Sequence, residues 1–532
     1  MDDKIKNCIE SGRALLGIEF GSTRIKAVLI DCERNPIAQG NHQWENKFED
    51  GLWTYSEADV WKGVQDAFAN LKKDVVEKYG VSLTSLGGVG VSAMMHGYMA
   101  FNKEGHLLVP FRTWRNTNTG KAAEELSEIF NFNIPLRWSI SHLYQAILDN
   151  EPHIREIDFM TTLAGYVHWK LTGEKVIGVG DGSGMMPVDP ATGDYDQTMI
   201  DKFESLTKKH GCEIKIRKIF PKILNAGQPA GEISKEGSLL LDPTGDLEAG
   251  IPMCPPEGDA GTGMVATNAV RPRTGNVSAG TSSFSMIVLE KELSRPYEEI
   301  DIVTTPDAKP VAMVHCNNCT SDINSWVGLL KETLKLFGKE LSDGELYTSL
   351  FNEALKGDAD AGGLLAYNFL SGEPIAKVMS GTPLFMRSVN DTFNLANFMR
   401  CHLYSALACL KIGNDILFVK EKVGVDRLTG HGGFFKTPVV GQCVLAAALN
   451  SPISVMSTAG EGGAWGMALL VDYMVNNSRQ LSLPDYLDKE VFAGNQGSTV
   501  SPQPKDVEGF DKFIASYQEC LPVEALAVTL KK

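Results

Sequence analysis

Two short apolar segments flank a polar turn near the beginning of the sequence, at residues 14–20 and 25–30. The turn between them contains Gly21, Ser22 and Thr23. Apolar, β-rich runs on both sides of a glycine turn are typical of a β-hairpin, because glycine adopts tight backbone conformations that other residues avoid. The sequence therefore predicts a hairpin whose turn presents two hydroxyl side chains.

A second hairpin is predicted at residues 275–289, about half a chain length later. Its turn contains Gly280, Thr281 and Ser282. A hairpin that recurs at half the chain length indicates two related domains, each of which begins with the same type of hairpin.

Helical and strand-like patterns alternate through much of the sequence. Residues 57–79 carry apolar side chains at helical spacing after Ser56, which is a favourable N-cap. Residues 86–93 form an apolar run that predicts a buried strand. Further helices are predicted at 329–337, 398–412 and 444–449. This alternation indicates a protein of the α/β class.

Length and composition restrict the class of protein. The 532 residues exceed what one compact domain usually holds, so at least two domains are expected. Hydrophobic residues make up 43% of the chain and charged residues 22%, which excludes global disorder. The formal charge of −16 repels phosphate backbones and anionic lipid, so neither nucleic acid nor a membrane is an expected partner. The polar segment from Ser478 onward is expected to be peripheral.

The ten cysteines are too few for a disulfide scaffold. Cys316 and Cys319 have CxxC spacing, but no second CxxC or paired histidines complete a tetrahedral metal set, which favours two incidental thiols. The first residues lack the apolar segment of a secretory signal, and no apolar run is long enough to span a bilayer. These features predict a cytoplasmic location with reduced thiols.

Several common catalytic patterns are missing from the sequence. It contains no GxxxxGK[ST] phosphate loop, no HExxH and no GxSxG. Residues 178–184 are rich in glycine, but Ser183 stands where the dinucleotide fingerprint requires its third glycine. A Rossmann oxidoreductase is therefore disfavoured.

The two Gly-Ser/Thr turns suit a phosphate chain, because they offer backbone N–H groups and hydroxyls at close range. Most single turns of this composition are only turns. The repetition nevertheless favours a functional role. Two such turns facing each other would clamp a nucleotide between two domains.

The predicted strand at 86–93 leads into Met95, His96 and Gly97. Ligands of α/β sheets bind at the carboxyl ends of strands, which places His96 well for a substrate, although a histidine in a turn is equally common. The polar loop 114–116 contains a tryptophan that could stack on a sugar face or fill the core.

Asp259 follows a glycine, just before the second predicted hairpin. A hydroxyl that attacks a γ-phosphate needs a carboxylate to take its proton, together with a divalent cation. Asp259 fits the role of this base. Glu19, at the end of the first predicted strand, fits the role of a metal ligand.

These motifs, in this order, resemble the FGGY carbohydrate kinases, and the resemblance extends from Leu15 to about Met474. Residues 17–26 resemble the first phosphate motif of the family, with Lys26 at its basic phosphate-contact position. Residues 258–260 fall at the catalytic-base position. The other similar segments are the sugar-side residues 95–97 and 114–116, the helix and loop at 164–173 and 181–184, the second phosphate motif at 280–282, the adenosine-binding turn at 430–436 and a helix at 461–468.

The resemblance implies a two-domain α/β protein with the actin- and hexokinase-type ATPase fold, built from ribonuclease H-like domains with a cleft between them. Domain 1–265 would bind the sugar and carry the base, and domain 266–532 would bind the nucleotide. The implied function is transfer of the γ-phosphate of ATP, with Mg²⁺, to a hydroxyl of a small sugar, above all a ketopentose such as xylulose or ribulose. A homodimer is the candidate assembly.

The resemblance also assigns individual site residues. Asp259 is the implied catalytic base, and Glu19 with Asp259 would hold the metal. The implied nucleotide-binding residues are Gly21, Ser22, Thr23, Lys26, Gly280, Thr281, Ser282, Gly432, Gly433, Phe434 and Lys436. The implied substrate-binding residues are Met95, His96, Gly97, Trp114, Arg115, Asn116 and Asp259.

The sequence departs from the family pattern at several positions. Glu19 replaces the usual aspartate, so its carboxylate sits one methylene further out. Residues 141–146 lack the usual lysine and tryptophan, and Cys409 stands at a glutamate position. Ala260 follows the base as in ribulokinases, whereas xylulokinases usually have asparagine. Two alternatives therefore stay open: an actin- or chaperone-like ATPase switch, and a catalytically weakened sugar-binding homologue.

Overall fold

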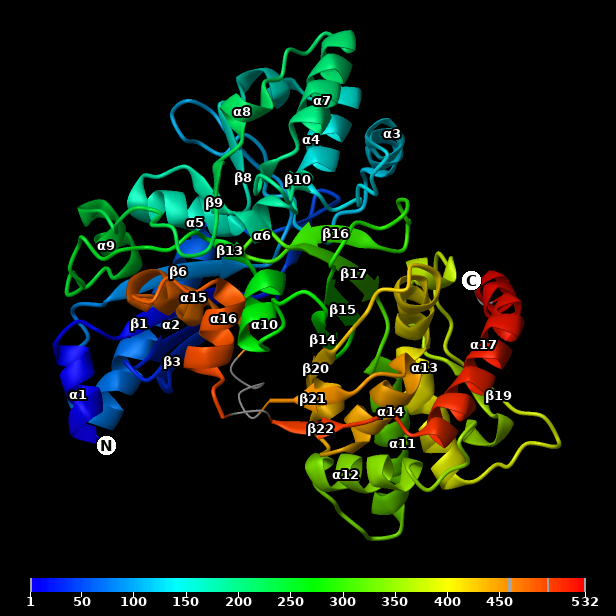
Figure 1. The fold of residues 1–532 in the computed structure, drawn as a ribbon. Coiled ribbons are helices and arrows are strands. Elements are labelled where there is room, and N and C mark those ends of the chain that lie inside the picture. Colours follow the sequence, from blue (N-terminus) through cyan, green and yellow to red (C-terminus); the bar gives the residue numbers. More distant parts are fainter. Residues whose placement is uncertain (1, 457–461, 495–496, 531–532) are drawn as a thin grey trace. The chain divides into compact units, whose positions relative to one another are not determined.

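The computed structural model describes residues 2–456, 462–494 and 497–530 (Figure 1). The chain divides into two compact units. The first unit comprises residues 1–270, 301–311 and 461–493, and the second comprises residues 271–300, 312–460 and 494–532. The chain therefore returns to the first unit twice after leaving it.

The first unit is built on a five-stranded sheet with the order β13-β6-β1-β2-β3. Strands β1 (Leu15–Phe20) and β2 (Arg24–Ile30) form the first predicted hairpin, which is thereby confirmed. Strand β3 (Pro36–Gln43) extends it antiparallel, whereas β6 (Gly88–Ala93) runs parallel to β1. Strand β13 (Glu257–Gly258) pairs parallel with β6, which brings the carboxyl ends of β1, β6 and β13 to one edge.

Helix α2 (Glu57–Tyr79) confirms the predicted helix with the same bounds. The Ser56 side chain accepts a hydrogen bond from the N–H of Asp59 at its start, and Gly80 ends the helix in the left-handed conformation at φ 67°. The helix packs against β3, where a Cβ atom on Gly40 would lie 2.0 Å from the carbonyl oxygen of Ala67. Glycine at this position permits the close approach of helix and strand.

Helices α10 (Asp259–Ala266) and α15 (Gly462–Asn476) pack against each other, although almost 200 residues separate them in the sequence. In Figure 1 the orange α15 also lies against the blue strands β1 and β6. A Cβ atom on Gly466 would lie 2.0 Å from the carbonyl oxygen of Thr262, and one on Gly17 would lie 2.0 Å from that of Ala464. Small residues thus hold the first strand and both helices at backbone contact.

The first unit also contains further helices and strands. They are α1 (Asp2–Glu10), β4 (Lys47–Glu49), β5 (Leu52–Thr54), β7 (Met99–Phe101), α3 (Gly120–Phe130), α4 (Ser139–Leu148), β8 (Phe159–Thr161), α5 (Leu163–Thr172), β9 (Val176–Gly178), α6 (Val179–Gly182), β10 (Val188–Asp189), β11 (Asp194–Tyr195), α7 (Gln197–Lys209), α8 (Ile216–Ile219), β12 (Lys222–Leu224), α9 (Lys235–Leu241), β16 (Asp301–Thr304) and α16 (Leu483–Tyr486).

The second unit contains a mixed sheet in which β17, β15, β14, β20, β21 and β22 are neighbours in that order. Strands β14 (Thr274–Ala279) and β15 (Ser283–Val288) form the second predicted hairpin, which is also confirmed. Strand β20 (Arg427–His431) runs parallel to β14. The other elements are β17 (Pro310–Cys316), α11 (Ser321–Leu336), α12 (Asp343–Ala354), β18 (Leu365–Tyr367), β19 (Leu384–Met386), α13 (Leu395–Asp415), α14 (Val440–Leu449), β21 (Ile453–Val455), β22 (Ser498–Val500) and α17 (Pro504–Leu530).

The prediction that the segment after Ser478 is peripheral is wrong for helix α17. Its Phe510, Phe513 and Tyr517 are buried, and the helix packs against α13 and α14, as the red, yellow and orange ribbons of Figure 1 show. These aromatic residues recur at helical spacing within a polar stretch, so one face of the helix is apolar. The overall polar composition of the segment does not reveal this face. None of the described helices combines the length and apolar character that crossing a membrane requires.

Candidate active site

The turn of the first hairpin is fixed by side chains from later segments of the chain. The carbonyl oxygen of Gly21 accepts a hydrogen bond from the indole Nε1 of Trp44, at 2.8 Å. The Ser22 hydroxyl accepts one from Nε1 of Trp114, at 3.3 Å. The structure therefore brings together Ser22 and Trp114, which the sequence assigned to the nucleotide and to the sugar. Thr23 is exposed at the tip.

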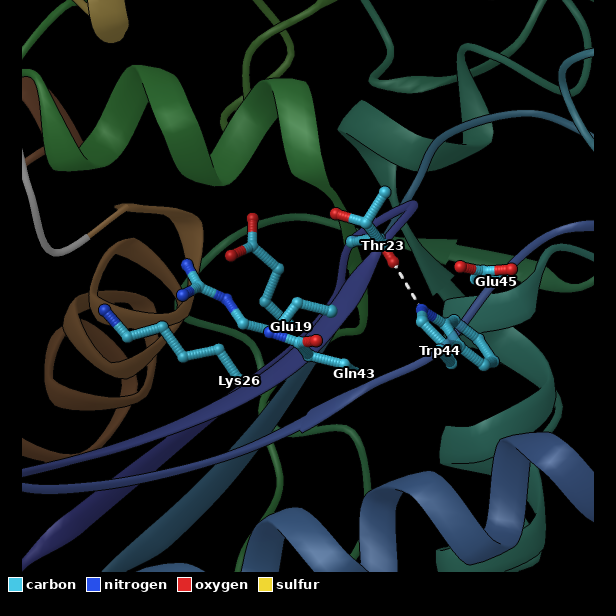
Figure 2. A pocket seen from close by; sticks show the side chains of 8 residues that line it. Glu19, Thr23, Lys26, Gln43, Trp44 and Glu45 are labelled. Carbon is cyan, nitrogen blue, oxygen red and sulfur yellow. Dashed lines mark hydrogen bonds between the residues drawn. The ribbon is translucent and has the colours of Figure 1, made fainter. Parts of the chain in front are cut away.

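A pocket of about 830 Å³ opens beside this turn (Figure 2). It is lined by Glu19, Gly21, Thr23, Arg24, Lys26, Gln43, Trp44 and Glu45. Arg24 and Lys26 are two residues apart on β2, so their side chains lie on the same face of the strand. Lys26 stands directly opposite Glu19 in the hairpin register. The positive charge of Arg24 acts on the carboxylate of Glu19.

Glu19 lies where several charges and the end of a helix meet. Burial and the neighbouring charge of Asp259 raise the pKa of Glu19 to about 7. The positive charges of Lys26 and Arg24, and a hydrogen bond from the backbone of Ala464, oppose this rise in pKa. Because its pKa is close to neutrality, the ionised form of Glu19 would be favoured further by any cation that enters the pocket.

Asp259 is the first residue of helix α10, after the N-cap Gly258. Its Oδ1 accepts a hydrogen bond from the backbone N–H of Met95, at 3.2 Å, so two predicted site residues are in direct contact. Burial raises the pKa of Asp259 to about 6, and backbone hydrogen bonds limit the rise. At neutral pH this carboxylate is ionised and only weakly basic, which suits a group that takes up a proton during reaction.

Two further carboxyl groups, which sequence reasoning missed, lie behind Asp259. Both oxygens of Glu257 accept backbone hydrogen bonds, from Gly180 at 3.3 Å and from Asp181 at 3.0 Å. Burial raises the pKa of Glu257 to about 8 and that of Asp181 to about 7. The charge of Asp259 contributes to the rise at Asp181, so Asp181 and the predicted base influence each other's ionisation.

Asp181 is buried, with 1% of its surface exposed, and only one of its oxygens is satisfied. Oδ2 accepts a hydrogen bond from the Thr162 hydroxyl at 2.5 Å, whereas Oδ1 has no partner among the described residues. The available signal in the sequence was the glycine run at 178–184, which allows the backbone to approach Glu257 closely. A Cβ atom on Gly178 would lie 2.2 Å from Oε1 of Glu257.

His96 and Gly97 form a sharp turn after β6, with φ angles of 70° and 93°. This left-handed conformation is costly for histidine, which indicates that the surroundings hold it in place. Nδ1 of His96 lies within hydrogen-bond distance of the carbonyl oxygen of Gly184, at 3.2 Å. Its ring stacks on that of Trp138, at 6.1 Å between centroids and 19° between planes. Nε1 of Trp138 has no partner among the described residues.

The side chains of Arg115 and Asn116 both contact Trp53. The Asn116 side chain accepts a hydrogen bond from the N–H of Trp53 at 2.9 Å and donates one to its carbonyl oxygen at 2.8 Å. The guanidinium of Arg115 lies 3.6 Å from the centroid of the Trp53 ring. These contacts hold the loop in place, and direct contact of either residue with a substrate stays a prediction.

The second hairpin turn, in the second unit, is open on one side. The Gly280 N–H donates to the carbonyl oxygen of Ser282 at 2.9 Å, and the hydroxyl of Thr320 donates to the carbonyl oxygen of Gly280 at 2.7 Å. Thr281 is exposed. No atom lies within 4 Å of a Cβ built on Gly280. The turn therefore has room beside its backbone for a ligand.

The predicted adenosine-binding turn follows β20 directly. Gly432 has φ 100°, and a Cβ atom on it would lie 2.5 Å from the carbonyl oxygen of Ala279 at the end of β14. Within the second unit, this turn and the Gly280 turn are therefore neighbours. Gly433 is exposed, as is Lys436, whereas Phe434 is buried, with 1% of its surface exposed. Glu461 in the last matched segment lies outside the described residues.

A metal site is not formed by protein side chains alone in the described part of the chain, where no group of three or more His, Cys, Asp or Glu side chains is placed to hold an ion. Glu19 and Asp259 nevertheless fit Mg²⁺, which is commonly held by one or two carboxylates together with substrate phosphates and water. Repulsion between these two carboxylates contributes to the raised pKa of Glu19. A bound cation would relieve this repulsion. Cys316 and Cys319 are free, buried thiols.

Two family models match the chain. The N-terminal domain of the FGGY family of carbohydrate kinases matches residues 14–265, and the C-terminal domain of that family matches residues 275–474. Together the two models cover well over half of the chain.

Curated relatives are distant. The xylulose kinase of Haemophilus influenzae is 22% identical over 476 residues, which is 84% of this chain and 91% of that protein. The xylulose kinase of Escherichia coli is 22% identical over 53% of this chain, and the match spans only 55% of that protein. The autoinducer-2 kinase of E. coli is 24% identical over 57% of this chain and 56% of that protein.

Solved structures show the same fold. The gluconate kinase of Lactobacillus acidophilus superposes with a TM-score of 0.78 at 17% identity, over 96% of this chain and 98% of that one. The xylulose kinase of Rhodospirillum rubrum gives a TM-score of 0.77 at 16% identity, over 96% and 99%. These neighbours confirm the predicted α/β fold of the actin and hexokinase type. With both family models matched in order, the chain belongs to the FGGY family of carbohydrate kinases.

Proposed function

We propose that this protein transfers the γ-phosphate of ATP to a hydroxyl of a small sugar, with a ketopentose such as xylulose or ribulose as the acceptor. Membership of the family supports the kinase class and ATP as the co-substrate. The names of its relatives include xylulose, glycerol and autoinducer-2 kinases, whose acceptors differ. All of them are named as kinases of small molecules. The choice of a ketopentose as the acceptor is therefore a more specific proposal than the kinase activity itself.

The buried Asp259 carries this proposal. It is held by the Met95 N–H at the start of a helix, and its pKa of about 6 leaves it ionised at neutral pH. An acceptor hydroxyl within reach of this carboxylate would lose its proton to it as the oxygen bonds to phosphorus. Burial keeps water from competing for the same position.

The cations of the first hairpin support binding of a polyphosphate. Lys26 and Arg24 line one pocket with the Gly21 turn and Glu19. We assign both residues to contacts with the phosphates, with Arg24 as an addition to the residues expected from the sequence. Mg²⁺ bound beside Glu19 would neutralise charge on the β- and γ-phosphates.

The surroundings of His96 support a polyhydroxylated acceptor. Nε1 of Trp138 and Oδ1 of Asp181 are buried atoms without a partner among the described residues. A buried donor or acceptor without a partner costs free energy, which a ligand hydroxyl would recover. His96 connects these two positions, because it stacks on Trp138 and contacts Gly184 beside Asp181.

In the second unit, the neighbouring turns at Gly280 and Gly432 support binding of the nucleotide. No atom lies within 4 Å of a Cβ built on Gly280 or on Gly433, which leaves open space for a planar group such as adenine. The buried Phe434 would support the turn from below. The homodimer, Mg²⁺ and the cytoplasmic location stay predictions.

One experiment separates the proposal from its two alternatives. Release of ADP is measured with the purified protein, ATP and Mg²⁺ in the presence of pentuloses, hexuloses, polyols and gluconate. Stimulation by one sugar supports a kinase and names its acceptor. Turnover that is independent of every sugar supports an ATPase switch, and saturable sugar binding without turnover supports a weakened homologue.

A matched pair of variants tests the base. Asp259→Asn keeps the shape of the side chain but removes the proton acceptor, so sugar-dependent turnover should fall by about 10³-fold or more while ATP binding persists. Asp201→Asn, an exposed position on α7, should leave turnover unchanged. Sugar-dependent turnover that survives in Asp259→Asn would contradict the assignment.

A further inference from the structure

Two cysteine side chains of the first unit face each other outside the pocket. Cys8 lies in helix α1, and Cys32 lies two residues after the end of β2. Their Sγ atoms are 2.7 Å apart. Cys8 is buried, with 3% of its surface exposed, whereas Cys32 is exposed. A disulfide bond joins sulfur atoms at about 2.0 Å, so a bond here requires movement of less than about 1 Å.

The backbone on both sides of this pair is well fixed. Cys8 and Ile9 belong to the hydrophobic core of the first unit, which anchors α1. Cys32 lies in a turn closed by Asp31, whose Oδ1 accepts hydrogen bonds from the N–H groups of Glu33 and Asn35, both at 2.9 Å. Neither sulfur therefore needs a backbone rearrangement to remain opposite the other.

The turn that carries Cys32 is also tied to helix α15. Nε of Arg34 donates to Oδ2 of Asp472 at 2.6 Å, and Nε1 of Trp465 donates to the carbonyl oxygen of Arg34 at 3.1 Å. A bond between Cys8 and Cys32 would thus add α1 to a connection that already joins the first hairpin to α15.

We propose that Cys8 and Cys32 are a thiol-modification site that closes to an intramolecular disulfide on exchange with a small-molecule disulfide of the glutathione type. The thiolate of Cys32 attacks the reagent, forms a mixed disulfide and releases one equivalent of reagent thiol. Cys8 then attacks Sγ of Cys32 and releases the second equivalent. The protein loses two electrons and two protons, and the reagent disulfide is reduced to two thiols.

Accessibility sets the order of these steps. Cys32 is exposed, so it meets the reagent first. Burial and the neighbouring Cys32 raise the pKa of the Cys8 thiol to about 12, so Cys8 reacts poorly with a dissolved reagent. Its contact with Cys32 gives the second, intramolecular step the advantage of proximity. The other cysteines are buried or partly buried.

Peptide mapping under non-reducing conditions tests this site on the intact chain. The reduced protein is incubated with oxidised glutathione, digested and analysed by mass spectrometry. We expect one peptide pair linked through Cys8 and Cys32. In Cys8→Ser, Cys32 should instead retain glutathione, because the resolving thiol is gone. Cys212→Ser is the matched control and should form the linked pair like the wild type.

Cys32→Ser serves as a second test, because an exposed side chain is replaced without disturbing the core. In this variant Cys8 should remain reduced. The oxidised wild type should unfold at a temperature about 2 °C or more above the reduced wild type, and Cys32→Ser should show no such difference. Stable glutathione on Cys32 of the wild type, a linked pair elsewhere, or an unchanged or lowered unfolding temperature would overturn the proposal.

Discussion

Gly463 leaves room for the carboxylate of Glu19. A Cβ atom at position 463 would lie 2.2 Å from Oε1 of Glu19, well inside contact distance. Glu19 carries one methylene more than the aspartate expected at its position, and the longer side chain reaches the first turn of α15, where the backbone of Ala464 hydrogen-bonds to it. The glutamate and the glycine therefore fit each other.

Gly463→Ala should displace the Glu19 carboxylate. Because a small misplacement of a catalytic group is costly, we expect kcat to fall by about 10²-fold and the Mg²⁺ concentration for half-maximal activity to rise. Steady-state kinetics at varied Mg²⁺ measures both. Gly328→Ala is the control, since that helical glycine of α11 has open space around it and its replacement should leave kcat unchanged. Equal activity of the two variants would show that the position of Glu19 is not critical.

Arg24 should set the acid limb of the pH–rate profile. Its positive charge favours the ionised form of Glu19, so Arg24→Gln should raise the pKa of Glu19 above its present value of about 7. If the ionised form is required, the acid limb of kcat moves to higher pH, and activity is lost at a pH where the wild type still works. Arg217→Gln, far along the chain on α8, is the control and should leave the limb in place. A fall in kcat that is the same at every pH would instead indicate phosphate contact alone.

Asp181 should make the first unit less stable at alkaline pH. Its folded pKa of about 7 lies above the value in an unfolded chain, so the folded state binds the proton more tightly. Its contribution to stability is therefore present at low pH and declines as the pH rises through about 7. Asp181→Asn removes this titration. The unfolding temperature of the variant is compared with that of the wild type at each pH. The difference, variant minus wild type, should be larger at pH 8 than at pH 5.

Thermal unfolding of both proteins at the two pH values measures this difference directly, and other titrating groups cancel between them. If Asp181→Asn were equally destabilised at both pH values, the hydrogen bond from Thr162 to Asp181 would contribute more to stability than the buried charge of Asp181 removes.

Trp114 should support the phosphate turn through its indole N–H. Trp114→Phe keeps an aromatic ring but removes the hydrogen bond to Ser22. Loss of one hydrogen bond of about 1 kcal/mol should raise KM for ATP by about fivefold. Trp326→Phe, which loses an indole hydrogen bond to Asp322 in the second unit, is the matched control and should change KM little. A change confined to KM for the sugar would place Trp114 on the substrate side instead.

Local sequence signals predicted the elements whose stability depends on interactions between residues close together in the sequence. Helix α2 has the predicted bounds because its apolar spacing, the Ser56 cap and Gly80 all act within a few residues. The two hairpins follow from apolar runs around glycine turns, and their order with the later motifs was enough to identify the family. The family and the fold are confirmed, whereas the roles of individual site residues stay proposals.

Long-range packing determined what the sequence pattern could not. Glu257 and Asp181 became neighbours only because β13 joins β6 and the chain at Gly180 approaches Glu257 closely. The apolar face of α17 and the return of α15 to the first unit were likewise invisible to local periodicity. The sequence by itself determined the strands, turns and helices that place Glu19 and Asp259. Only the tertiary structure decided which charges surround these two carboxylates, because the pKa of a buried group depends on neighbours that are distant in sequence.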